Sequence, residues 1–356
     1  MDIKNIDKNF IPVEVDSEGL EFFDVRNEPF SIYGLYDAKG NLPFKRLPDE
    51  IGKNVNEGVK RLYLHTAGGR VRFSTDSPYI AISVKLHVSS RFAHMSFCGS
   101  MGLDLYMDSD DGHEHIYKGV FLPPVAPCDS YRAKVIVGDK QKRNYTLNLP
   151  SYSGVTELLV GVEAGASLSY GVGYENTLPV IYYGSSITQG ACASRPGNSY
   201  QNIVSGRMNF DYLNFGFSGN GRAEDTIVDY MASLDMCAFV SDYDHNAPNA
   251  AYLEVTNRNM YKKIREKHPD IPYIMISKPD FDKDKADARK RRDAILKAYN
   301  EGMAQGDKNL YFIDGEAIFG TLYREACTVD GVHPNDLGFA LMADAVEKAL
   351  KLAFKA

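Results

Sequence analysis

The sequence contains no tryptophan, only five cysteines and no long run of apolar residues. The cysteines are scattered and odd in number, and none forms a C-x-x-C pair, which argues against a disulfide framework and against zinc-finger spacing. They are Cys98, Cys128, Cys192, Cys237 and Cys327. We therefore expect reduced, mostly buried thiols. Because no stretch approaches the roughly 18 apolar residues that span a bilayer, we expect no membrane segment.

The charge balance and the first residues narrow the class of protein further. Forty Lys plus Arg against 47 Asp plus Glu give a formal net charge of −7, which argues against nucleic acid as a partner and against a polybasic membrane anchor. The segment from Met1 to Lys8 lacks the apolar stretch of a signal peptide, so we expect a cytoplasmic protein, with export left open. The sequence does not indicate an oligomeric state.

The length of 356 residues and the 44% hydrophobic content predict a large core divided between two domains. In the first half, apolar and polar residues alternate with period two in several short runs. This pattern is typical of strands in an antiparallel sandwich, and we assign residues 1–174 to such a domain. The predicted strands are residues 59–66, 79–88, 103–107, 115–121, 131–137, 145–149 and 155–162.

After about residue 175 the pattern changes to continuous apolar strands that alternate with segments of helical length, which predicts a parallel sheet covered by helices on both faces. Residues 175–356 form this second predicted domain. We expect strands at residues 178–183, 212–215, 236–242, 273–277 and 310–313. We expect helices at residues 199–209, 223–234, 251–267, 283–302 and 336–354. In such sheets the reactive groups gather at the carboxyl ends of the strands.

Two segments carry side chains suited to nucleophilic catalysis. Gly184-Ser185-Ser186-Ile187 follows the first of these strands, where a serine hydroxyl can face the crevice, although such pairs also serve as turns. Asp330-Gly331-Val332-His333 precedes the last helix; its spacing lets a carboxylate hold one nitrogen of the imidazole and leave the other as a base. The alternative is an aspartate that caps a turn beside a surface histidine. The G-x-S-x-G order of α/β-hydrolases is absent.

Together the two segments resemble the SGNH/GDSL hydrolases. Gly184-Ser185-Ser186-Ile187 is similar to the G-D-S-L block of that family, with Ser185 in place of the usual aspartate, and Asp330-x-x-His333 is similar to its last block. The resemblance implies a flavodoxin-like three-layer α/β/α domain, with Ser186 as nucleophile, His333 as general base and Asp330 as the residue that orients it. It implies neither a metal nor an organic cofactor.

The same resemblance implies an oxyanion hole made by the Ser186 N–H, Gly219 and Asn246. Gly219 lies in the segment from Asn214 to Gly221, which is similar to the family's glycine block, and Gly216 is the other possible register. Asn246 lies in Asp242-Tyr243-Asp244-His245-Asn246, where the family commonly has G-x-N-D. Glycine and asparagine are also ordinary turn and cap residues, so the blocks gain meaning only from arriving in the family's order.

Gly102-Leu103-Asp104-Leu105-Tyr106 matches the G-x-D-L-Y motif of a jelly-roll-like domain that precedes some SGNH hydrolases. We expect Asp104 to be a paired structural residue of a strand. The alternative is that the edge of the sandwich contributes substrate contacts to a cleft between the domains.

These resemblances imply a serine esterase that hydrolyses short acyl esters, above all O-acetyl groups on carbohydrates. The expected partner is a small-molecule or oligosaccharide ester. Two alternatives stay open. The first is an acyltransferase, or an esterase or thioesterase that acts on a non-carbohydrate small molecule. The second is a glycan-binding protein whose hydrolase domain is inert.

Overall fold

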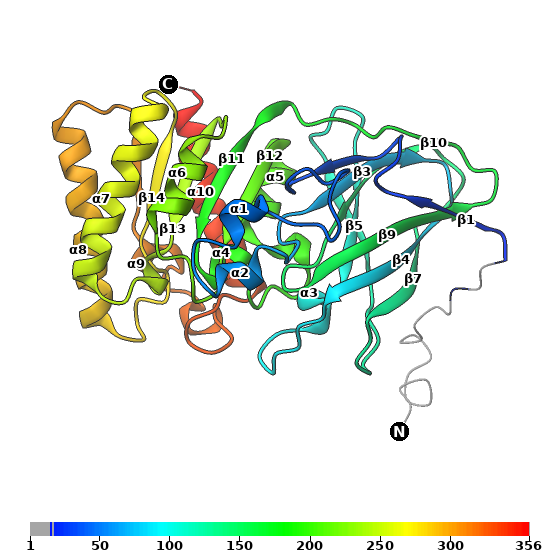
Figure 1. Cartoon of the computed structure of the whole chain (residues 1–356), viewed down its shortest axis with the longest axis horizontal. Coiled ribbons are helices and arrows are strands. Elements are labelled where there is room, and N and C mark those ends of the chain that lie inside the picture. Colours follow the sequence, from blue (N-terminus) through cyan, green and yellow to red (C-terminus); the bar gives the residue numbers. More distant parts are fainter. Residues whose placement is uncertain (1–14, 16–17, 356) are drawn as a thin grey trace.

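The computed structural model describes residue 15 and residues 18–355 (Figure 1). Two antiparallel sheets occupy the first half of the chain, and a parallel sheet with helices occupies the second. This arrangement confirms the predicted fold class. Met1 to Lys8, on which the expectation about export rests, lie outside the described residues. Within the described part, no helix is both long and apolar enough to cross a bilayer.

The first half is a β-sandwich of two sheets, with strand orders β1-β9-β4-β7 and β10-β3-β8-β5-β6, and with β2 paired to β3. Alternate residues of each strand point into a shared core; in β4 these are Ile80, Ile82, Val84 and Leu86. The strands of the first sheet are β1 (Leu20–Asp24), β9 (Gly154–Glu163), β4 (Tyr79–Val88) and β7 (Ser130–Ile136). Those of the second are β10 (Leu168–Ser169), β3 (Arg70–Thr75), β8 (Arg143–Asn148), β5 (Leu103–Asp108), β6 (His115–Phe121) and β2 (Ser31–Tyr33).

One predicted strand is wrong. Residues 59–66 begin with helix α2 (Val59–Leu62), which follows α1 (Asp49–Gly52). Asn56 caps this turn by accepting the N–H groups of Gly58 and Val59 at 3.0 and 2.9 Å. Val59 and Leu62, three residues apart, face the core beside the parallel sheet rather than the sandwich. The apolar spacing suits a helix, and the partner that buries it comes from the other half of the chain.

The parallel sheet has the order β12-β11-β13-β14-β15, which is the flavodoxin-like order. Its strands match the five predicted ones with longer or shorter ends. They are β11 (Asn176–Gly184), β12 (Phe210–Gly216), β13 (Ala238–Asp242), β14 (Tyr273–Ile276) and β15 (Leu310–Ile313).

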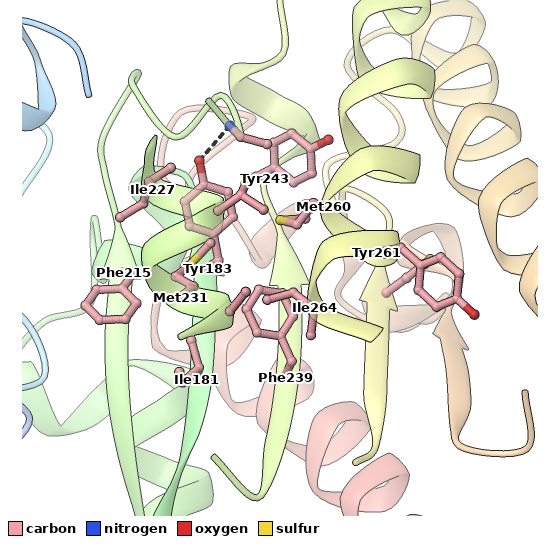
Figure 2. Packing of buried hydrophobic residues seen from close by; sticks show 14 of the residues in the cluster. Ile181, Tyr183, Phe215, Ile227, Met231, Phe239, Tyr243, Met260, Tyr261 and Ile264 are labelled. Carbon is pink, nitrogen blue, oxygen red and sulfur yellow. Dashed lines mark hydrogen bonds between the residues drawn. The ribbon is translucent and has the colours of Figure 1, made fainter. Parts of the chain in front are cut away.

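Helices cover both faces of this sheet, as Figure 1 shows. Their bounds are α4 (Ser186–Gln189), α5 (Tyr200–Met208), α6 (Asp225–Ala232), α7 (Ala250–Lys267), α8 (Lys285–Ala304), α9 (Gly315–Ile318) and α10 (Asp336–Ala353). Alternate residues of β11 face opposite cores: Val180 and Tyr182 pack with α5 and α10, whereas Ile181 and Tyr183 pack with α6 and α7. Figure 2 shows the second core, in which the Tyr183 hydroxyl accepts the backbone N–H of Ala223 at 2.6 Å.

Two buried arginines join the sandwich side to the parallel sheet. The guanidinium of Arg46 donates to the carbonyls of Asn214 and Gly216 at 2.8 and 2.7 Å, and also to those of Leu62 and His65. Arg70 of β3 pairs with Asp211 at the start of β12. Since Arg46 holds the last residue of β12, the sandwich side helps to fix the edge at which the candidate site lies.

Candidate active site

Three strands of the parallel sheet end at the same level. Gly184 of β11 pairs with Gly216 of β12 on one side and with Asp242 of β13 on the other. Ser186, Gly219 and Asn246 follow these three ends within a few residues. The chain order therefore delivers all three predicted residues to one carboxyl edge, beside the position where the strand order reverses.

Ser186 is the first residue of α4. Ser185 precedes it as N-cap, and its hydroxyl accepts the N–H of Ile187 at 3.1 Å. Gly190, in the left-handed conformation with φ +99°, ends the helix after one turn. Ser185 therefore has a structural role, and the side chain that reaches the crevice is that of Ser186.

The Ser186 hydroxyl meets His333 from the loop before α10. Ser186 Oγ lies 2.9 Å from His333 Nε2, and His333 Nδ1 lies 2.7 Å from Asp330 Oδ2. The second carboxylate oxygen of Asp330 accepts the N–H groups of Val332 and His333 at 3.0 and 2.8 Å. Asp330 thus closes its own turn and also orients the imidazole, so both roles considered from the sequence are present together.

Asp330 is built to stay ionised. Partial burial raises its pKa, but the backbone and the ring of His333 and the N–H of Val332 outweigh that effect and lower the pKa to about 2. A neutral His333 with its proton on Nδ1 then donates to Asp330 and presents Nε2 to Ser186 as a base.

The two remaining predicted residues lie beside each other in the next turns. Asn246 ends the short helix η4 (Asp244–Asn246), and its amide donates to the Phe217 carbonyl at 3.0 Å. Gly219, two residues after Phe217, has a φ of +70°, and its N–H finds no acceptor among the described residues. By contrast, the Gly216 N–H already donates to the Asn214 side chain at 2.9 Å. This difference favours Gly219 over Gly216 as the donor register.

Gly216 has a packing role instead. A Cβ on Gly216 would lie 2.2 Å from the backbone nitrogen of Gln189, which cannot swing away as a side chain would. We expect Gly216→Ala to lower the free energy of unfolding by roughly 3 kcal/mol, as overpacking does at its upper end. Urea denaturation measures this change. Gly173→Ala is the matched control, because a Cβ there meets nothing within 4 Å; equal losses in the two variants would contradict the packing role.

A buried ionic cluster supports the turn that carries Asn246. His245 Nε2 lies 2.5 Å from Asp280 Oδ1, and His245 Nδ1 lies 3.2 Å from Asp244 Oδ1 without the alignment of a hydrogen bond. Burial lowers the pKa of His245, but these two carboxylates outweigh it and raise the pKa to about 10. Arg291 of α8 donates to the carbonyls of Asp244 and Ala247 at 2.6 and 2.9 Å. The sequence pattern of α8 indicates a solvated face and gives no sign of this contact.

Sequence reasoning also missed the sandwich residues beside His333. His94, in the loop between β4 and α3 (Phe97–Ser100), places its ring centroid 5.5 Å from that of His333. Phe92 and Tyr152 form an edge contact at 5.7 Å, and the Tyr152 hydroxyl donates to the Ser186 carbonyl at 3.2 Å. No local motif marks these residues, because the packing of the two halves brings them to the site.

Cys192 completes this border. It lies in the turn after α4 with a φ of +69°, and its thiol donates to the His94 carbonyl at 3.4 Å. Burial, together with the charge of Asp330, raises the pKa of Cys192 to about 12. The thiol is therefore protonated at neutral pH and is not a nucleophile on its own.

Asp104 of β5 has the structural role that we expected. Its buried carboxylate accepts from the Asn148 amide at 2.9 Å, from Arg195 at 3.0 Å and from the Gly197 N–H at 2.9 Å. The Arg195 guanidinium also lies 3.8 Å from the centre of the Tyr117 ring. Asp104 thus anchors the segment that follows α4 and contains Cys192.

Comparison with known proteins agrees with this geometry. Residues 177–351 match the GDSL-like lipase/acylhydrolase family, and residues 20–168 match the N-terminal region, known as GxDLY, of SGNH-hydrolase-type esterases. The chain belongs to the GDSL-like lipase/acylhydrolase family. No curated protein matches it.

Several solved structures share the fold of this GDSL-family chain. A GDSL-like lipase from Bacteroides ovatus is 28% identical, with a TM-score of 0.82 and coverage of 93% of this chain and 98% of that one. A salicylyl-acyltransferase from a tetracycline biosynthetic pathway is 20% identical, with a TM-score of 0.75 and coverage of 95% and 98%. An acetyl xylan esterase from the rumen bacterium Butyrivibrio proteoclasticus is 12% identical, with a TM-score of 0.57 and coverage of 94% and 99%.

Proposed function

We propose that this GDSL-family hydrolase is a serine esterase that removes short acyl groups, above all acetyl, from hydroxyls of carbohydrates. The observation that carries the proposal is the hydrogen-bonded series from Ser186 through His333 to Asp330 at the carboxyl edge of the sheet. An activated serine needs a base within hydrogen-bond reach and a third group that orients the base, and this series supplies both.

Acylation begins when His333 Nε2 takes the proton of the Ser186 hydroxyl as Oγ attacks the carbonyl carbon of the ester. The imidazolium that forms lies against the ionised Asp330. His333 then returns the proton to the leaving alcohol as the carbon–oxygen bond breaks. In the second half, His333 takes a proton from water as the water oxygen attacks the carbonyl carbon of the acyl-enzyme. The bond between that carbon and Ser186 Oγ then breaks, His333 returns the proton to Oγ, and the carboxylic acid leaves.

The tetrahedral intermediate places a negative charge on the former carbonyl oxygen. We assign its stabilisation to the N–H groups of Ser186 and Gly219 and to the amide of Asn246. Each such donor lowers the barrier by about 3 kcal/mol. The Asn246 amide donates one of its two hydrogens to the Phe217 carbonyl, which leaves the other hydrogen for the substrate.

A hollow beside the Asp330 loop, whose lining includes Asp330 but neither Ser186 nor His333, supports a hydrophilic carrier. The hollow is open, with a volume of about 650 Å³, and most of its lining side chains are charged. The lining residues are Pro279, Asp280, Asp282, Lys283, Lys285, Phe319, Arg324, Glu325, Thr328, Asp330 and Gly331. The presence of an acetyl xylan esterase among proteins of the same fold agrees with an acetylated carbohydrate as substrate.

We expect kcat/KM for aryl esters to be highest with acetate and at least about tenfold lower with decanoate, because a long chain finds charged groups beside the triad loop where it needs an apolar channel. Initial rates with acetate, butyrate and decanoate esters measure this preference. Release of acetate from acetylated oligosaccharides then tests the carrier. A preference for decanoate would contradict the substrate class, while leaving the serine mechanism intact.

Acyl transfer is the second candidate, since the salicylyl-acyltransferase shares the fold over nearly the whole chain. Both reactions use the same acyl-enzyme and differ in whether water or an alcohol resolves it. Product analysis in the presence of competing alcohols separates them. An ester product that dominates over free acid at low alcohol concentration would favour the transferase.

A further inference from the structure

Three soft metal-binding side chains meet at the candidate active site from separate parts of the chain. They are His94 of the sandwich loop, Cys192 of the turn after α4 and His333 of the Asp330 loop. One ring nitrogen of each histidine and the sulfur of Cys192 all lie within 4.8 Å of one another. The planes of the His94 and His333 rings are tilted by 38° to each other, so the two rings are not stacked.

This donor set is the kind that zinc prefers. Thiolate and imidazole are its commonest protein ligands, and a tetrahedral ion with Zn–N and Zn–S bonds of about 2.0 and 2.3 Å holds its ligand atoms about 3.3–3.6 Å apart. The observed spacing therefore has to shrink by only about 1 Å. His94 can provide the movement, because its side chain is exposed and its ring nitrogens have no hydrogen-bond partner among the described residues.

The third ligand is already oriented for a metal. His333 Nδ1 is held by Asp330 Oδ2 at 2.7 Å, which leaves the lone pair of Nε2 on the side of the ring where Ser186 Oγ lies at 2.9 Å. A carboxylate behind a metal-binding histidine is the usual arrangement of such sites, since it fixes the ring and makes the nitrogen a better ligand. The same hydrogen bond that prepares His333 as a base therefore also prepares it as a ligand.

We propose that His94, Cys192 and His333 form a regulatory Zn²⁺ site that reversibly switches off the hydrolase. Zinc binds one ring nitrogen of His94, Nε2 of His333 and the sulfur of Cys192, and water is the fourth ligand. The proton of the Cys192 thiol passes to solvent. The lone pair of Nε2 that accepts the Ser186 proton is then occupied by the metal. The oxidation state of zinc and of sulfur does not change, so a chelator restores the base.

Zinc binding tests this proposal without reference to activity. We expect the native chain to bind one Zn²⁺ in calorimetry, and Co²⁺ in its place to show the charge-transfer absorption of a metal thiolate. His94→Gln and Cys192→Ser should each weaken binding at least about tenfold, and Cys192→Ser should abolish that absorption. Because the His94 side chain is exposed, we expect His94→Gln to keep the fold. This variant therefore still tests the zinc site if Cys192→Ser unfolds.

Matched controls come from the sandwich, where Cys128→Ser and His113→Gln remove the same groups away from the cluster. Zinc affinity within about twofold of the native chain in both His94→Gln and Cys192→Ser, or the absence of binding by the native chain, would overturn the proposal. Inhibition by zinc and recovery with a chelator rest on the proposed esterase function. If the native chain hydrolyses no ester, the binding experiments still decide the metal site.

Discussion

Replacing Ser186 with alanine is expected to lower kcat for an aryl acetate by about 10⁶-fold, to the residual rate that oriented donors and binding provide. The reason is geometric: Ser186 Oγ is the atom 2.9 Å from the base, and the variant leaves His333 without the hydroxyl that it activates. Steady-state rates of the purified variant, with active-site labelling by a serine-directed phosphonate, measure the loss.

The neighbouring serine is the control. The Ser185 hydroxyl caps α4 and is buried, so Ser185→Ala should cost about 1 kcal/mol of stability and leave kcat within about tenfold of the native value. Activity that survives Ser186→Ala, or labelling that follows Ser185, would show that the nucleophile lies elsewhere. Failure of the native chain to react with the phosphonate would favour an inert, glycan-binding protein.

The sequence pattern predicts the elements whose burial is decided locally. The alternating run at residues 79–88 coincides with β4, and the last helix ends within one residue of its predicted end. The strand predicted at residues 59–66 is wrong because Val59 and Leu62 are buried against the core of the parallel sheet, whose strands lie far along the sequence. Strands β1, β2, β3 and β10 were not predicted, and β2 and β10 are only three and two residues long. Such short edge strands form because a partner is present rather than because of their own pattern.

The candidate site divides in the same way. Ser186, Asp330 and His333 follow strand ends or precede a helix, so topology and family resemblance suffice to expect them together, and the hydrogen bonds show that they are together. His94 could not be predicted as a neighbour of His333, because these two rings meet only when the sandwich docks on the sheet. Cys192 lies in the same half of the chain as His333, but no local motif marks the turn after α4 that contains it. The boundary between residues 174 and 175 stays a prediction. Helices α1 and α2, from the first half, pack on the core of the second.

Replacing Asp330 with asparagine should lower kcat by about 10⁴-fold with little change in KM. The amide can still accept the N–H groups of Val332 and His333 through its oxygen, so the turn persists. Its NH₂ then faces His333 Nδ1, which can only accept; the ring proton moves to Nε2, and His333 can no longer take the Ser186 proton. Rates of ester hydrolysis across a range of pH measure the effect.

The dependence of kcat on pH distinguishes a misoriented His333 from an unfolded protein in the Asp330→Asn variant. The pKa of Asp330 is about 2, so the carboxylate is ionised throughout the range in which esterases are assayed, and its protonation does not produce the acid limb of the native profile. Raising the pH therefore cannot rescue Asp330→Asn. Asp336→Asn is the matched control. Asp336 is the first residue of α10 and accepts hydrogen bonds from Ser194 rather than from the imidazole, so this variant should keep kcat within about threefold of the native value. If Asp330→Asn lost no more activity than Asp336→Asn, the carboxylate would serve the turn alone, and the orientation of His333 would have to come from the N–H and packing of its own loop.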